Sequence, residues 1–305
     1  MQVDKSYFEI QKNGITPFQS FLCYLGGSTF QTIGDNPITA YRQFIQQYAK
    51  DTAGKLVDPK VARQEANQIF MRSPVSASMS GLSSRMVGIL LKRIPKFGTL
   101  FLYTSLSGKS GEPGFAAATF ASIVSAPFIN PVRMMEKQQR VSFRETGKEK
   151  HVKDILRESA EKKFKPLFRG TIPLMGHSLI SAMLGLVGQP QLQKHIQSEL
   201  GTKTKLGESA SNLIASAAVT PFYVFFTNPL SRLEVIMQTT PINKKQIGFL
   251  EACKELSYDM ALNGMKGVFR GQGIGMAKGV LSLTLFHEGR LFLMKHAKES
   301  NKAYL

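Results

Sequence analysis

The dipeptide Asn-Pro occurs three times in this chain of 305 residues, at Asn36-Pro37, Asn130-Pro131 and Asn228-Pro229. The three prolines are 94 and 98 residues apart, and each stands at or close to the end of a run without Asp, Glu, Lys or Arg. Periodicity on this scale indicates a chain built from structural repeats. We therefore divide it into three units, at residues 1–109, 110–205 and 206–305.

Six segments have the length and composition of membrane-spanning helices. Four contain no charged residue: Thr16–Gly34, Pro113–Val132, Thr171–Gln193 and Ser209–Ser231. Two more, Arg85–Lys109 and Gln272–Lys295, are largely apolar with scattered basic residues. A helix needs about 20 residues to cross a bilayer core. Buried helices of a soluble enzyme are the alternative, but these usually keep a polar stripe, and Ser209–Ser231 has no charge on any side.

The formal net charge of +18 arises mainly between the apolar runs. The segment Glu136–Arg169 alone holds eleven basic and six acidic residues. Membrane proteins concentrate Lys and Arg in loops that face anionic lipid. No nucleic-acid motif is present, so we expect no nucleic-acid partner. Cys23 and Cys253 stand alone, and we find no catalytic or metal-spaced cluster. We therefore expect neither an enzyme nor a cofactor.

Each Asn-Pro is followed by a polar segment and then by a corner that ends in Gly. The three corners are Met79-Ser80-Gly81, Phe168-Arg169-Gly170 and Phe269-Arg270-Gly271. Helical-looking runs continue after the prolines, so we interpret Pro37, Pro131 and Pro229 as helix kinks, a turn being the alternative. At a corner, free backbone N–H groups beside a basic side chain form an anion site.

These residues resemble the mitochondrial carrier (solute carrier) family, of which this chain would be a divergent member. The resemblance covers roughly Pro17 to Lys295. It implies an all-α membrane protein with six transmembrane helices in three pseudo-threefold repeats and short matrix helices. It also implies a multi-pass location in the mitochondrial inner membrane, with cardiolipin as bound lipid. The implied lipid-binding residues are Arg169, Gly170, Gly264, Arg270 and Gly271. In the second unit, Lys162-Lys163 replaces the acidic-Gly pair of the family.

The matrix gate of the family is altered here. The family pairs an acid two residues after each Pro with a base five residues after the Pro of the next odd helix. The corresponding pairs are Thr39 with Glu136, Arg133 with Glu234, and Ser231 with Arg42. Only Arg133–Glu234 keeps opposite charges, with the signs exchanged, and a swapped pair has the same Coulomb attraction. The alternative is that Arg133 and Glu234 are solvated charges at the matrix end that do not pair. Gln46 and Gln238 match the family's glutamine brace, whereas Arg140 does not.

Four polar residues inside the expected spans are candidates for substrate binding: Lys92, His177, Ser178 and Lys278. Ionisable residues within a membrane span are costly, and by default they serve a function and face a wet interior. A basic ring of this kind would attract an anion. A lone His on an apolar helix is also commonly a hydrogen-bonded interior residue, so both interpretations of His177 stay open.

Two functions follow from these observations. The degenerate gate predicts an accessory or structural subunit of a large, respiratory-type inner-membrane assembly. The basic ring predicts an active transporter that exchanges a small anionic metabolite across the same membrane. In both cases the partners include membrane lipid, and we favour the accessory role.

Overall fold

The computed structural model describes residues 17–47, 58–89, 91, 115–181, 183–184, 188–200, 205–240, 242 and 246–303. The described part of the chain is helical and contains no β-strand, as the sequence predicts for an all-α protein. Lys92 and most of the segment Arg85–Lys109 lie outside the described residues.

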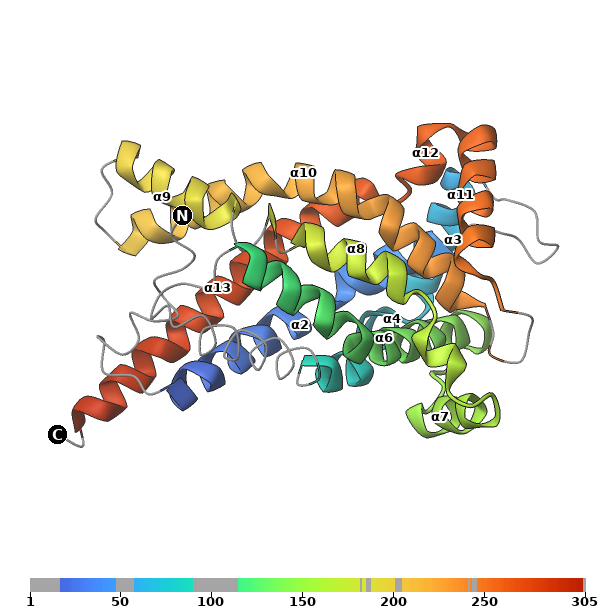
Figure 1. The fold of residues 1–305 in the computed structure, drawn as a ribbon, viewed down its shortest axis with the longest axis horizontal. Helices are drawn as coiled ribbons and strands as arrows, with labels where there is room; N and C mark the ends of the chain where they lie inside the picture. The colour runs from blue at the N-terminus through green and yellow to red at the C-terminus, as the bar shows by residue number, and fades with distance from the viewer. Residues whose placement is uncertain are drawn as a thin grey trace.

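Five helices and one helical stretch form a closed ring. The helices are α2 (Pro17–Gln47), α6 (Phe115–Thr146), α8 (Thr171–Ser181), α10 (Lys205–Thr239) and α13 (Gln272–Ala303). The stretch 82–89 lies between α2 and α6, where Arg85 pairs with Asp35 and Ser84 donates to Gln139. From α6 the ring continues through α8, α10 and α13, and α13 packs along α2 to close it (Figure 1).

Shorter helices gather at the two ends of this ring. They are α3 (Pro59–Arg72), α4 (Pro74–Met79), α7 (Val152–Glu161), η2 (Lys165–Phe168), α9 (Gln189–Leu200), α11 (Phe249–Asn263) and α12 (Met265–Val268). Figure 1 shows α3, α7, α11 and α12 at one end, whereas α9 and the C-terminus lie at the other. Local sequence explains the start of α3, because the Asp58 side chain accepts from the Lys60 N–H at 2.6 Å and Pro59 occupies the first turn.

Pro37, Pro131 and Pro229 lie inside α2, α6 and α10, respectively. The helix continues for ten residues beyond Pro37, fifteen beyond Pro131 and ten beyond Pro229. The turn interpretation is therefore wrong at all three positions. A proline within a helix removes one backbone hydrogen bond and bends the axis.

One helix in the described part of the chain, Ala210–Thr239, is both long and apolar enough to cross a membrane. Helices α2, α6 and α13 have 31 or 32 residues, which is sufficient in length. Their mean hydropathy is lower because they carry many polar residues, which are largely buried in α2 and α6, whereas α13 also has exposed charged residues such as Lys295 and Glu299.

The polarity of the long helices is reversed relative to a water-soluble protein. Large apolar side chains are exposed on their outer faces, including Leu22, Phe30, Ile33, Phe120, Phe128, Leu213, Phe222 and Phe226. Polar and charged side chains are buried between the helices, including Asp35, Asn36, Asn130, Glu136, Arg140, Asn228, Arg232 and Glu234. Burying polar groups and exposing apolar groups is unfavourable in water, whereas lipid favours the exposed apolar surface.

Candidate functional site

The three Asn-Pro sites make the same contact with the three corners. Asn36 Nδ2 donates to the carbonyl of Ser78 at 2.6 Å. Asn130 Nδ2 donates to Leu167 O at 2.9 Å, and Asn228 Nδ2 donates to Val268 O at 2.9 Å. Each acceptor is the third residue before the corner Gly. All three Asn side chains are fully buried, so each fastens one long helix to its own corner.

The corner glycines are also equivalent. Gly81, Gly170 and Gly271 have φ values of +70°, +78° and +76°. This left-handed conformation favours glycine. Space is short as well, because a Cβ on Gly170 would lie 2.9 Å from Gln238 Nε2. The backbone conformation therefore favours Gly at each corner, and close packing adds to this at Gly81 and Gly170.

The next long helix closes over two of these corners. Gln238 of α10 donates through Nε2 to Asn130 Oδ1 at 2.8 Å and to Arg169 O at 2.7 Å. Arg140 of α6 makes the same two contacts at the first corner, to Asn36 Oδ1 at 3.2 Å and to Ser80 O at 3.1 Å.

The sequence analysis treats Arg140 as a departure from the brace pattern, but the structure gives it the same place. The usable signal is its spacing, because Arg140 stands ten residues after Asn130, as Gln238 stands ten after Asn228. At the third corner, Arg42 Nη2 donates to Asn228 Oδ1 at 2.7 Å, and the Gln46 side chain lies against Gly271.

Arg133 and Glu234 form the ion pair that the sequence predicts, with Nη1 and Oε2 3.1 Å apart. Glu234 has a second partner that the sequence analysis missed, since Lys137 Nζ lies 2.8 Å from Oε1. Lys137 stands four residues after Arg133, one helical turn along the same face. The carboxylate on α10 thus holds two cations of α6.

The other two expected pairings differ in the structure. Glu136 pairs with Arg140 at 2.5 Å and with Arg85 at 3.9 Å, while Thr39 donates to Asp35 at 3.5 Å. Arg42 binds Asn228, as described above. Glu136, Thr39 and Arg42 therefore bind residues other than the partners that the family pattern assigns to them.

A buried Arg-Asp-Arg triad holds the third unit together, and the sequence analysis did not identify it. Asp259 of α11 lies 2.9 Å from Arg232 Nη2 and 3.4 Å from Arg270 Nη2. Arg232 also donates to Gln46 O at 2.6 Å, which links α10 to α2. Both partners of Asp259 are almost completely buried, and the single carboxylate balances only one of their two positive charges, so the triad keeps a net positive charge.

The candidate substrate residues are only partly brought together. His177 and Ser178 lie on α8 and Lys278 lies on α13, all half-buried, while Lys92 falls outside the described residues. His177 is hydrogen-bonded, because Nε2 lies 3.2 Å from Tyr223 Oη and Nδ1 lies 3.5 Å from Ser181 Oγ. This geometry favours the interpretation of His177 as a hydrogen-bonded interior residue.

The candidate lipid-binding arginines point inward. Arg169 reaches the carbonyl of Met237 at 3.5 Å, and Arg270 binds Asp259. Burial lowers the pKa of Arg169 to about 10 and also lowers that of Arg270. Gly170 and Gly271 complete their corners, whereas Gly264 is exposed with φ +59° and ends α11.

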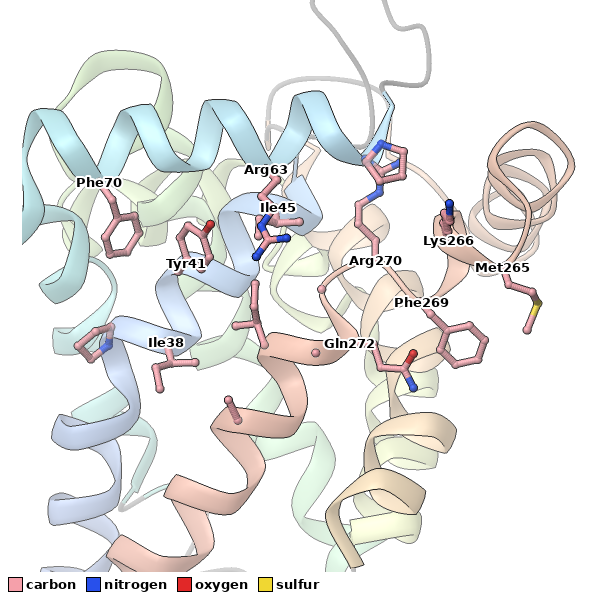
Figure 2. Close-up of a pocket in the computed structure, with 16 residues that line it drawn as sticks. Ile38, Tyr41, Ile45, Arg63, Phe70, Met265, Lys266, Phe269, Arg270 and Gln272 are labelled. Atoms are coloured by element: carbon pink, nitrogen blue, oxygen red, sulfur yellow. The ribbon is translucent and has the colours of Figure 1, made fainter. Parts of the chain in front are cut away.

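A cavity of about 920 Å³ opens beside the third corner, between α2, α3 and the start of α13 (Figure 2). Arg270 and Gly271 line it together with Tyr41, Arg63 and Phe269. Its walls combine apolar surface with basic side chains, a composition that suits an amphipathic anion. In the described residues, no three His, Cys, Asp or Glu side chains converge as metal ligands.

Comparison of the sequence with models of known protein families and with curated proteins gives no match.

Proposed function

We propose that this chain is a membrane-embedded, carrier-type bundle of six spans in three repeats, located in the mitochondrial inner membrane. The reversed polarity of the long helices carries the proposal. Apolar side chains such as Phe30, Phe128 and Phe222 are 49 to 64% exposed, while Asn36, Asn130 and Asn228 are completely buried. In lipid, polar groups must find partners inside the protein, as these do.

The equivalence of the corners supports the threefold repeat. Asn side chain, acceptor carbonyl and left-handed Gly recur in the same relation in each unit. Recurrence of one buried polar contact at intervals near one hundred residues indicates that the three units are structurally equivalent. Pseudo-threefold packing of three equivalent units explains the recurrence.

Within this fold, we favour an accessory or structural subunit of a large inner-membrane assembly, such as a respiratory complex. A carrier must open and close each end of its cavity. Here the end that holds the three Asn-Pro sites is joined at all three helix interfaces. Arg140 connects α6 to the first corner, Glu234 connects α10 to α6, and Arg232 connects α10 to α2.

Opening this end would separate three buried charged groups from partners on other helices. Separating Glu234 from its partners on α6 breaks a buried ion pair, which costs about 3–5 kcal/mol. Arg140 and Arg232 each lose a hydrogen bond to an oxygen on another helix, and a hydrogen bond from a charged group contributes about 1.5–3 kcal/mol. A substrate must supply only about 5.5 kcal/mol of differential affinity to reverse a 1:99 equilibrium, and few ligands supply much more. Three such contacts favour a permanently closed end, and hence a structural role.

Extraction in mild detergent, followed by native gel electrophoresis, tests the accessory role. We expect the protein to migrate with a complex of megadalton size, with the carrier-type bundle intact. Migration as a free monomer under conditions that preserve other inner-membrane complexes would overturn this role.

Exchange of a small anionic metabolite is the second candidate, and Lys278 supports it. Lys278 lies on the inner side of α13, where Asp35 provides the main opposite charge. Vesicles that contain the purified protein would then take up a labelled anion. Lys278→Ala would abolish uptake, while Lys295→Ala, at an exposed position of the same helix, would leave it unchanged. A lack of uptake across a broad anion panel would exclude this candidate.

The swapped ion pair provides a test of the closed end itself. We expect Arg133→Glu to lower the thermal unfolding midpoint, because two acids would then face each other on α6 and α10. Adding Glu234→Arg should restore part of the loss. Restoration should be incomplete, since Lys137 would face the new arginine. Strictly additive effects in this double-mutant cycle would show that the pair does not hold the two helices together.

A further inference from the structure

The loop between α7 and η2 presents three lysines and a phenylalanine to the exterior. Lys162, Lys163, Phe164 and Lys165 are all exposed, and Phe164 is 47% accessible. Glu161 is the acidic residue directly before them. The third unit has Asn263, Gly264, Met265 and Lys266 at the same places, and hence one basic residue instead of three.

The backbone of this loop is strained in a way that glycine would relieve. Lys163 and Phe164 have φ values of +53° and +58°. Lys163 occupies the position where helices usually end on Gly, since its N–H bonds Ala160 O at 2.9 Å and the Phe164 N–H bonds Ser159 O at 2.8 Å. Gly264 has φ +59° at the equivalent position of the third unit. The lysine thus adds backbone strain that a glycine avoids, and side chains kept in strained conformations commonly serve a function.

Apolar side chains lead from this loop to the outer face of α8. Phe164, Phe168 and Ile172 are spaced four residues apart and are 47, 52 and 61% exposed. In the third unit, the residue equivalent to Phe168 is Phe269, which stacks on Phe225 with ring centroids 5.1 Å apart. The second unit therefore has an aromatic and basic surface in place of a packed one.

We propose that Lys162, Lys163, Phe164 and Lys165 anchor the second unit to anionic lipid headgroups at the membrane surface. This inference rests on the proposed membrane-embedded fold. Aromatic rings are favoured at the level of the headgroups, and basic residues beside them are attracted to anionic lipid. Exposed Ile172 continues the apolar surface into the expected span. The lysines therefore lie at the end of this span, where lipid headgroups are expected.

Because the chain contains no Trp, Phe164→Trp creates a single fluorescent reporter in the full-length protein. The protein is reconstituted in phosphatidylcholine vesicles with and without anionic lipid, using brominated lipids as quenchers. We expect roughly twofold stronger quenching with anionic lipid, and loss of the difference at high salt. Changing the three lysines to glutamine should abolish this difference in quenching between the two lipid compositions. Met265→Trp, at the equivalent position of the third unit, should show little dependence on anionic lipid.

Resistance to alkaline carbonate extraction, measured on the same vesicles, distinguishes a failure of the lipid anchor from a failure of the membrane-embedded fold. If the Phe164→Trp protein resists extraction but its indole stays open to an aqueous quencher with anionic lipid present, the lipid anchor is wrong. The loop would then suit an acidic protein surface. If carbonate removes the protein from the vesicles, both the membrane-embedded fold and the anchor are overturned.

Discussion

The first and second corners have the same geometry with different chemistry. At the first corner Arg140 covers Gly81, and at the second Gln238 covers Gly170. Both side chains donate to the carbonyl before the Gly and to the side-chain oxygen of the Asn. At these two corners a long side chain with a hydrogen-bond donor fills the same place, and it can be charged or neutral.

A nearby acid explains why a charged donor is tolerated at the first corner. Glu136, one turn before Arg140 on α6, neutralises its guanidinium at 2.5 Å. Glu234 stands one turn before Gln238 on α10, but Lys137 and Arg133 already neutralise it. A buried charge needs such a partner, whereas a neutral amide does not.

The largest effect is expected from Glu136→Gln. This change leaves the fully buried Arg140 without its carboxylate, and we expect a loss of about 3–5 kcal/mol in stability. Thermal unfolding in detergent measures it. Adding Arg140→Gln should recover most of the loss, because the first corner would then have the neutral donor of the second. If the double variant is no more stable than Glu136→Gln, the two corners are not chemically interchangeable.

Alanine at the corner glycines should have the next largest effect. We expect Gly81→Ala and Gly170→Ala each to cost about 1–3 kcal/mol, because both the positive φ and a close side chain oppose a Cβ. Gly147→Ala is the matched control, since Gly147 has φ +72° but no atom within 4 Å of the added Cβ. It should lose about 1 kcal/mol or less. Equal losses in all three variants would show that the covering side chains do not press on the corners.

Arg140→Gln alone should have a small effect, of about 1 kcal/mol or less, which is the net value of an ordinary hydrogen bond. Glu136 keeps Arg85 and Gln43 as neighbours in this variant. The unfolding midpoint is again the measurement, with Gln238→Ala for comparison. Gln238→Ala should cost more, since it leaves the buried oxygen of Asn130 without that donor. A reversed order would show that the first corner depends on the charge of its arginine.

The smallest expected effect is a gain. Lys163→Gly should stabilise the folded protein by about 0.5–1 kcal/mol, because glycine adopts the left-handed conformation without strain. Gly264→Lys in the third unit should destabilise by more, because Gly264 combines φ +59° with ψ −151°, a backbone region open almost only to glycine. Both stability changes are measured as shifts of the thermal unfolding midpoint in detergent without anionic lipid. A loss of stability in Lys163→Gly would mean that the lysine side chain stabilises the loop itself.

Much of the helical framework was predictable from local sequence. The Asn-Pro spacing located three equivalent long helices, and the apolar runs located α2, α6, α8, α10 and α13. The resemblance to the carrier family implied the Arg133–Glu234 pair, with its signs exchanged, and the structure contains this pair. The membrane and the six spans remain proposals. Polar residues on the inner faces of α2 and α6 lower the mean hydropathy of these helices, although their outer faces are apolar.

The sequence by itself determined where the long helices run and where they contain proline. These features depend on interactions within a few residues, which the order of amino acids specifies directly. Only the tertiary structure decided the partners of the buried charges: Lys137 with Glu234, Arg140 with the first corner, and Arg232 with Asp259. Their spacing in the chain ranges from 27 to 97 residues, so the pairing depends on which helix faces meet when the ring closes.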